Sequence, residues 1–301
     1  MNSNWMSVVV FVALLTPLQA QRAAANGGLP AVSPDGIHIA FLANRSGGED
    51  DVFVIASDGS AEKQLTRTPE DEGNAQWSAD GQRVVFSRFA GGNSRIYAIG
   101  MDGKNEHEIG SVPGRSPVFS PDGKQLVYMA GDSWTTTKLM VAAADGSHAR
   151  EINDGNSIAW NSHWSPDGKR IAFTGKNREG TLAIFVMNAD GSGLHQVTHL
   201  AAAEGNAQWP VWSPDGNSLA FQVNQLTEKT AHIWTLHVAT GETHKLAAHD
   251  SSYLDETPSW FPDGKRIAFQ SNRTGSIEVW EMNSDGSAPR QLTGSKSAAQ
   301  K

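Results

Sequence analysis

The sequence contains no cysteine, which excludes a disulfide framework, a thiolate metal site and a lipid-modified cysteine anchor. It also has no apolar run of the roughly 18 to 20 residues that a membrane-spanning helix needs. Positive charge is scarce, because 24 lysines and arginines stand against 32 aspartates and glutamates, for a net charge of −8. Proteins that bind phosphate-rich polymers need a clustered basic face, so we expect no nucleic-acid partner.

Motifs of common catalytic sites are missing as well. No G-x-S-x-G pentapeptide occurs, and the segment GDSWT at 131–135 lacks the final glycine of that serine-nucleophile motif. No glycine-rich nucleotide-binding pattern is present. The ten histidines have no spacing that would gather metal ligands. We therefore expect no catalytic residue, no metal and no cofactor, and we predict that the chain is not an enzyme.

The first twenty residues carry no lysine, arginine, aspartate or glutamate and contain the apolar run Met6 to Leu15. Such a run followed by a small residue is typical of a secretory signal peptide, so we predict cleavage after Ala20 and a periplasmic or secreted protein. The small residues Ala23 to Ala25 form a competing cleavage site. Because no lysine or arginine precedes the run, a buried or interfacial N-terminal segment is the alternative.

Turn-forming residues are abundant, and one turn recurs. Its commonest form is S-P-D-G, and its six copies begin at residues 33, 78, 120, 165, 213 and 261, about 46 residues apart. Proline presets the second position of a tight turn, aspartate bonds nearby backbone N–H groups, and glycine accepts the positive φ that sends the chain back. Each copy therefore predicts the junction of two antiparallel strands.

Each repeat keeps the same phase around its turn. Six residues after the turn aspartate there is always an aromatic residue, namely Phe41, Phe86, Tyr128, Phe173, Phe221 and Phe269. Directly before the turn a large apolar residue recurs, namely Val32, Trp77, Phe119, Trp164, Trp212 and Trp260. Two further strand-like runs follow in every unit. A four-stranded sheet cannot bury both of its faces alone, so we expect the large residues to act as wedges between stacked sheets.

These features predict an all-β fold: a six-bladed β-propeller with four antiparallel strands per blade, preceded by a signal peptide. We expect the ring to close by packing of whole blades, because the first unit opens with its innermost strand and the sixth ends with its outermost. The alternative is that residues 21 to 30 add a further strand. The predicted boundaries are a signal peptide at 1–20, a short segment at 21–29, blades at approximately 30–67, 68–110, 111–153, 154–198, 199–247 and 248–294, and a flexible tail at 295–301.

The composite pattern P-x-W-S-P-D-G-K-R-I-A-F, followed by I-x-V-M-N-x-D-G-S and R-Q-L-T, resembles the WD-like propeller repeat of the TolB family. The resemblance covers roughly residues 30 to 294. It implies a periplasmic propeller of the Tol–Pal envelope system whose partners include a peptidoglycan-associated protein. The same repeat occurs in the propellers of prolyl oligopeptidase-like and tricorn-like proteases and of oligogalacturonate lyases. TolB proteins also carry an α/β domain before the propeller. The resemblance is confined to the propeller repeats, so any contact made by that domain is not implied for this chain.

The segments that lead into the innermost strands are the candidate binding surface, because in a propeller they line one mouth of the channel. They contain carboxylates, one arginine and two tryptophans outside the wedge position. The candidate residues for binding a ligand or partner are Glu72, Asn74, Arg115, Trp160, His163, Glu204, Trp209, Asp255 and Glu256. Exposed aromatics would anchor a peptide or sugar, and carboxylates would select cationic groups. The alternative is that these residues are solvated loop charges and blade packing.

Three functional hypotheses follow. The first is a non-catalytic, monomeric periplasmic scaffold that binds a protein or peptide over its channel mouth. The alternative is a carbohydrate-active lyase or hydrolase of propeller type that uses channel residues. The third is a structural ring of blades without a ligand. A metal or closely packed carboxylates in the channel would favour the enzyme, and an open funnel would favour the binding protein.

Overall fold

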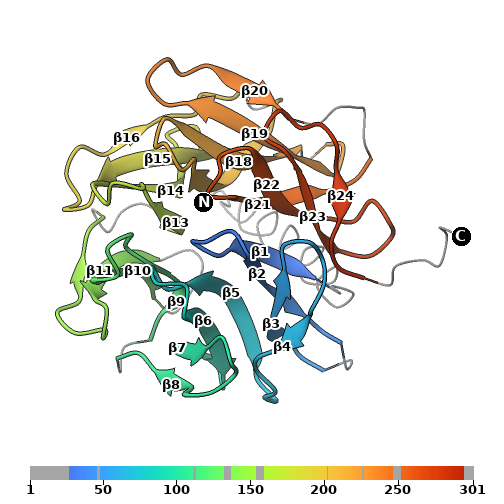
Figure 1. Cartoon of the computed structure of the whole chain (residues 1–301). Coiled ribbons are helices and arrows are strands. Elements are labelled where there is room, and N and C mark those ends of the chain that lie inside the picture. Colours follow the sequence, from blue (N-terminus) through green and yellow to red (C-terminus); the bar gives the residue numbers. More distant parts are fainter. Residues whose placement is uncertain are drawn as a thin grey trace, which may run out of the picture.

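The recurring turn leads to six four-stranded antiparallel sheets in the computed structural model of the chain. The structure describes residues 27–45, 48–110, 113–131, 137–153, 159–201, 203–225, 227–246 and 252–294. The sheets follow one another around a central axis in chain order (Figure 1). The predicted six-bladed propeller is confirmed. The predicted signal peptide and C-terminal tail lie outside the described residues.

Within every sheet, chain order runs from the axis to the rim. The innermost strands are β1 (Gly28–Val32), β5 (Asp71–Trp77), β9 (Arg115–Phe119), β13 (Ala159–Trp164), β17 (Asn206–Trp212) and β21 (Asp255–Trp260). The second strands are β2 (His38–Ala43), β6 (Arg83–Ala90), β10 (Gln125–Ala130), β14 (Arg170–Lys176), β18 (Ser218–Gln225) and β22 (Arg266–Ser271).

The two remaining strands of each blade lie toward the rim. The third strands are β3 (Asp51–Ala56), β7 (Asn93–Gly100), β11 (Lys138–Ala143), β15 (Leu182–Asn188), β19 (Thr230–His237) and β23 (Glu278–Asn283). The outermost strands are β4 (Lys63–Gln64), β8 (His107–Glu108), β12 (Arg150–Glu151), β16 (His195–Gln196), β20 (Thr243–Lys245) and β24 (Arg290–Gln291). Their shortness leaves little unpaired edge at the rim.

The fourth copy of the turn illustrates why the motif recurs. The hydroxyl of Ser165 donates to Asp167 Oδ1 at 2.6 Å, and the same oxygen accepts the N–H of Lys169 at 3.1 Å. Gly168 adopts φ of 68°, which returns the chain into the second strand. The Ser165 hydroxyl, followed by the backbone bond, lowers the pKa of Asp167. The carboxylate is therefore a fixed acceptor that holds the turn closed at neutral pH.

The recurring aromatic after each turn lies in the core. Phe41 pairs with Phe53 across β2 and β3, with ring centroids 5.6 Å apart, and Phe173 pairs with Phe185 across β14 and β15 at 5.8 Å. The six predicted positions, Phe41, Phe86, Tyr128, Phe173, Phe221 and Phe269, are all buried. Cross-strand aromatic pairs of this kind fix the register of a sheet.

The large apolar residue before each turn packs between blades, as predicted. Trp164 lies in one hydrophobic cluster with Val118 of the preceding blade, and its Nε1 donates to the Val118 carbonyl at 3.2 Å. Trp77 repeats this bond to the carbonyl of Ala31 at 2.8 Å. In these two blades the indole therefore bonds to the innermost strand of the blade before it, whereas Nε1 of Trp212 and of Trp260 makes no hydrogen bond within the described structure.

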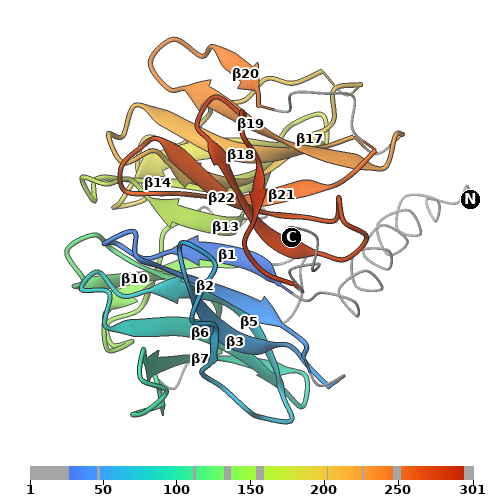
Figure 2. The ribbon, with the colours of Figure 1, turned by 45° about the vertical axis from the view of Figure 1, so that its right-hand side comes forward.

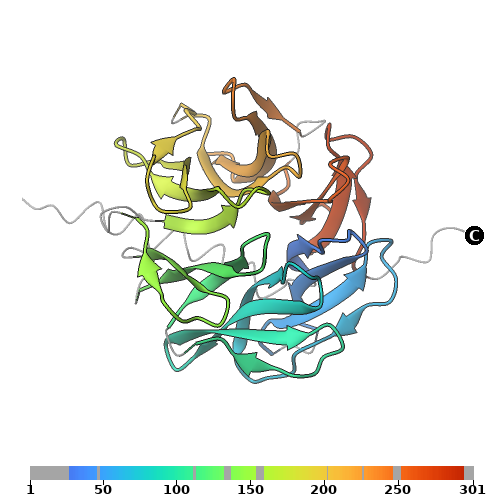
Figure 3. The same cartoon turned by 60° about the vertical axis from the view of Figure 1, so that its left-hand side comes forward.

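The ring closes between the first and sixth blades. All six sheets consist of four consecutive strands, so no strand is exchanged between blades within the described residues. Strand β1 lies beside β21 and β22, and the first (blue) and last (red) blades adjoin in Figures 2 and 3. The N–H of Gly27 donates to the carbonyl of Ile277 at 3.1 Å, and that of Val32 donates to Ser259 Oγ at 3.0 Å. From residue 27 onward, the ring thus closes by packing of whole blades, as expected.

Replacing the wedge residue should destabilise the ring. Trp164→Ala removes a side chain that is 3% exposed and its bond to the neighbouring blade, so we expect the free energy of unfolding to fall by about 3 to 5 kcal/mol. Urea denaturation followed by circular dichroism measures the change. Trp164→Phe keeps most of the packing but loses the Nε1 donor, so it should cost less. An unchanged midpoint for Trp164→Ala would contradict the wedge.

Candidate functional site

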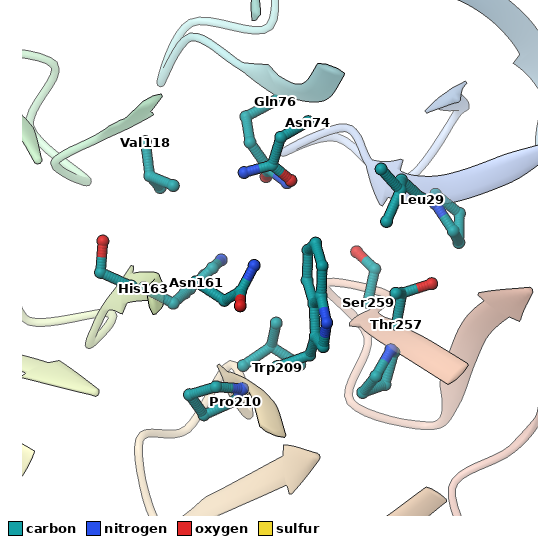
Figure 4. Close-up of a pocket in the computed structure, with 14 residues that line it drawn as sticks. Leu29, Asn74, Gln76, Val118, Asn161, His163, Trp209, Pro210, Thr257 and Ser259 are labelled. Carbon is teal, nitrogen blue, oxygen red and sulfur yellow. The ribbon is translucent and has the colours of Figure 1, made fainter. Parts of the chain in front are cut away.

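A central cavity lies where the six innermost strands converge (Figure 4). It encloses about 450 Å³, a figure that includes space open to solvent. All six blades contribute to its lining, which consists of Leu29, Pro30, Asn74, Gln76, Val118, Asn161, Ser162, His163, Trp209, Pro210, Val211, Thr257, Pro258 and Ser259. Not one of these described side chains is a carboxylate, lysine or arginine. The cavity therefore offers amides, hydroxyls and apolar surface.

A bulge in every innermost strand directs side chains toward this cavity. The pairing with the second strand shifts register once in each blade. At each shift one residue takes a left-handed φ between 51° and 56°, namely Leu29, Asn74, Ser116, Asn161, Trp209 and Thr257. All six stand six residues before the turn aspartate. A bulge adds an unpaired residue and changes the direction of a side chain, so this position shapes the channel.

The left-handed residues are stabilised in two ways. Blades two and four use Asn74 and Asn161, and asparagine tolerates this conformation. The other four positions carry residues that tolerate it less well, and each of these precedes a proline. Their N–H groups donate to a side chain of the preceding blade: Leu29 to Gln270 (2.9 Å), Ser116 to Ser87 (2.9 Å), Trp209 to Thr174 (3.1 Å) and Thr257 to Gln222 (2.9 Å).

Whether the left-handed residue is an asparagine or a residue whose N–H bonds a neighbouring side chain depends on the preceding blade. The acceptor side chain always stands one residue after the buried core aromatic of that blade. Before the two asparagine blades this place is taken by Leu42 and Met129, which have no oxygen to accept a bond. Asparagine therefore occurs where the neighbouring blade provides no acceptor.

Trp209 is the least expected of the left-handed residues. A bulky aromatic in this region costs about 1 to 3 kcal/mol, which the surrounding structure must offset. In Figure 4 its indole stands in the middle of the cavity, with Asn161 on one side and Ser259 on the other. The half-buried ring packs against the hydrophobic cluster that contains Leu29 and Ala75. A side chain of the fifth blade thus crosses the axis to reach the first two blades.

His163 also faces the cavity, and it does so as a neutral ring. Its Nδ1 lies 3.0 Å from the carbonyl oxygen of Trp164. A carbonyl can only accept, so Nδ1 carries the proton and Nε2 is an acceptor. Burial lowers the pKa of His163, and this effect exceeds the opposing one of the carbonyl bond. The imidazole is therefore uncharged at neutral pH.

The predicted carboxylate Glu72 lies away from the cavity, in an ion-pair network. Its Oε1 lies 2.7 Å from Arg88 Nε and accepts from the Thr68 hydroxyl at 2.8 Å, and its Oε2 accepts from the Thr66 hydroxyl at 3.0 Å. Arg88 also holds Glu106 through two bonds of 2.6 and 3.1 Å. Burial raises the pKa of Glu72 to about 7, while the bond from Arg88 acts in the opposite direction.

The other three predicted carboxylates are also bound elsewhere. Asp255 receives two bonds from Arg273, at 2.7 and 2.8 Å. Glu256 accepts from Gln270 Nε2 at 2.9 Å, and Glu204 accepts the N–H of Ala201 in its own exposed loop at 2.7 Å. The structure therefore does not bring these carboxylates together around the channel.

Of the nine candidate residues, only Asn74, His163 and Trp209 line the cavity. Trp160 and Arg115 are each 8% exposed, so neither is a surface anchor, and burial lowers the pKa of Arg115. Sequence analysis missed five polar residues of the lining, namely Gln76, Asn161, Ser162, Thr257 and Ser259. Their signal was available in the fixed distance from the turn aspartate, which places equivalent residues of all six blades on the axis.

The described part of the chain contains no group of three or more histidine, aspartate or glutamate side chains placed to bind a metal ion. Over the same residues, no helix has the length and apolar character required to cross a membrane.

Comparison with curated proteins finds peptidases. Dipeptidyl-peptidase 5 of Porphyromonas endodontalis is 29% identical over 124 residues, which cover 39% of this chain and 18% of that protein. Dipeptidyl-peptidase 5 of Porphyromonas gingivalis is 24% identical over 231 residues, or 72% of this chain and 33% of that protein. The chain thus spans a third or less of the length of these relatives.

The prediction that the chain is not an enzyme is contradicted by these peptidase relatives. That prediction depended on a missing nucleophile motif. The absence has little weight, because the sequence matches only a fraction of each peptidase and can lack a motif that the rest of the protein carries.

Among solved structures, TolB from Acinetobacter baumannii is similar, with a TM-score of 0.68 and 17% identity over 95% of this chain and 69% of that chain. At this identity the likeness establishes the fold. A family model described as the TolB beta propeller domain matches residues 6–131, 104–209 and 195–301, which is nearly the whole sequence. The chain therefore belongs to the TolB β-propeller family.

Proposed function

We propose that this chain is the peptide-binding propeller of a peptidase-type protein and that peptides bind in its central cavity. The observation that supports this most is the composition of the lining, in which uncharged amides and hydroxyls from the second, fourth and sixth blades converge with apolar side chains of the other three. Pockets that bind organic ligands combine apolar surface with a few convergent polar groups in this way.

A peptide fits this lining because its backbone alternates donors and acceptors. The carboxamides of Asn74, Gln76 and Asn161 can each donate and accept, and Nε2 of His163 accepts. The prolines and Val118 provide apolar contact for side chains. The names of the curated relatives support peptides as the class of ligand. Peptide hydrolysis by the protein to which the propeller belongs is part of the same proposal and depends on those relatives.

The proposal places the protein at the cell envelope, periplasmic or secreted. Family membership and the apolar N-terminal run support this location. A protein partner at the channel mouth, such as a peptidoglycan-associated envelope protein, would offer the cavity an extended segment. We propose that the chain acts as a monomer, because closure of the ring within one chain already buries both faces of every blade.

A charged side chain placed in the cavity should weaken peptide binding. Gln76 is half-buried, and Gln76→Arg adds bulk and an uncompensated charge to the lining. We expect at least about tenfold weaker retention of a library of short, end-blocked peptides on the immobilised full chain, measured by mass spectrometry. Gln82→Arg makes the same change on an exposed turn and is the matched control. Equal retention by the two variants would overturn the proposed site.

A further inference from the structure

Two hydroxyl groups of the cavity lining have no hydrogen-bond partner within the described structure. They belong to Ser162, which is 3% exposed, and Thr257, which is 6% exposed. A buried hydroxyl that makes no bond destabilises the folded chain, and most proteins avoid it. The two residues come from the fourth and sixth blades and flank Trp209 of the fifth. Both hydroxyls thus belong to the lining of the cavity whose middle this indole occupies.

The hydroxyl oxygens themselves have almost no exposed surface. The indole of Trp209 stands across the same cavity (Figure 4). Its backbone is held in the left-handed region, and its ring is only half-buried. A ligand that fills the middle of the cavity must therefore displace the indole.

Charge is kept out of the cavity by the pairing of the nearby carboxylates. Glu72 and Asp255 stand at the beginning of the innermost strands β5 and β21, but each is bonded to an arginine of its own blade, Arg88 or Arg273. His163 is neutral, so no formal charge remains in the lining. An ionised group that entered would lose its hydration without gaining a counter-charge.

We infer that the channel selects an uncharged, amide-bearing segment of a peptide, and that the indole of Trp209 occupies the place of this segment in the unliganded chain. The inference rests on the proposed peptide-binding function and specifies its ligand. An amide of the segment both donates and accepts, so it can satisfy the hydroxyls of Ser162 and Thr257 together with Nε2 of His163.

Three matched peptides test the selection. They are short, end-blocked and identical except for a central Gln, Glu or Lys, and their binding to the full chain is measured by isothermal titration calorimetry. We expect the Gln peptide to bind at least about tenfold more tightly than the Glu and Lys peptides. Equal affinity of all three would overturn the inference and leave the proposed function standing. Failure of all three to bind would overturn the proposed function itself.

Thr257→Val tests the role of the hydroxyl. Valine has the same shape, and the backbone N–H that bonds Gln222 is retained. We expect unfolding midpoints equal to or above those of the unmodified chain, with about tenfold weaker binding of the Gln peptide. The control is Ser259→Ala, whose hydroxyl accepts from Val32, so its loss should lower the unfolding midpoint. Unchanged affinity in Thr257→Val would show that the hydroxyl does not contact the ligand.

Trp209→Ala tests the displacement of the indole. If the ring must leave before the peptide enters, its removal raises the fraction of chains that can bind. We expect the Gln peptide to bind about threefold more tightly or better, with its preference over the Glu peptide retained. Weaker binding would contradict the displacement, because it would mean that the indole is a contact in the complex.

Discussion

The structure depends on a bulge at the same place in each innermost strand. There one residue takes a left-handed conformation, and in four blades its N–H is bonded by a side chain of the blade before it. This contact joins adjacent sheets near the axis, while the tryptophan wedges join them further along the same strand. It also changes the direction of the chain, so that side chains of the bulge point into the cavity. Stability of the ring and shape of the channel therefore have a common origin.

Because that conformation can be supported in two ways, the six repeats need not be identical on the axis. Where the neighbour supplies Gln, Ser or Thr, the bulge residue can be Leu29, Ser116, Trp209 or Thr257. Where the neighbour has Leu42 or Met129, asparagine takes the position. The fold thus constrains the backbone of every blade but leaves the side chain free to vary. Variation at this position allows one repeat to build an asymmetric cavity, with an indole on one side and carboxamides on the other.

The sequence was sufficient to predict the fold, because turn, core aromatic and wedge recur at fixed spacing and each has a direct physical meaning. It was insufficient for the site. Glu72 and Asp255 were expected at the channel mouth because their segments lead into the innermost strands, but Arg88 on β6 and Arg273 in the turn after β22 bind them within their own blades. Only the antiparallel register brings these charges together. Asn161 and Thr257 carry no charge or motif of their own in the sequence; only their shared distance from the turn aspartate marks the bulge position, and its role on the axis becomes visible only in the structure.

The pairing of carboxylates with arginines also explains why the channel can recognise a neutral group. A carboxylate on the axis would bind cations by charge alone, at long range and with little regard for shape. With Glu72 and Asp255 neutralised within their own blades, attraction in the cavity comes from hydrogen bonds, which require contact and direction. The partnerless hydroxyls of Ser162 and Thr257 increase the role of hydrogen bonds in binding. A ligand that bonds them removes the free-energy penalty of a buried, unsatisfied hydroxyl, whereas a ligand that does not bond them leaves that penalty in place. Selection by hydrogen bonding therefore follows from where the charges are placed as much as from the residues that line the cavity.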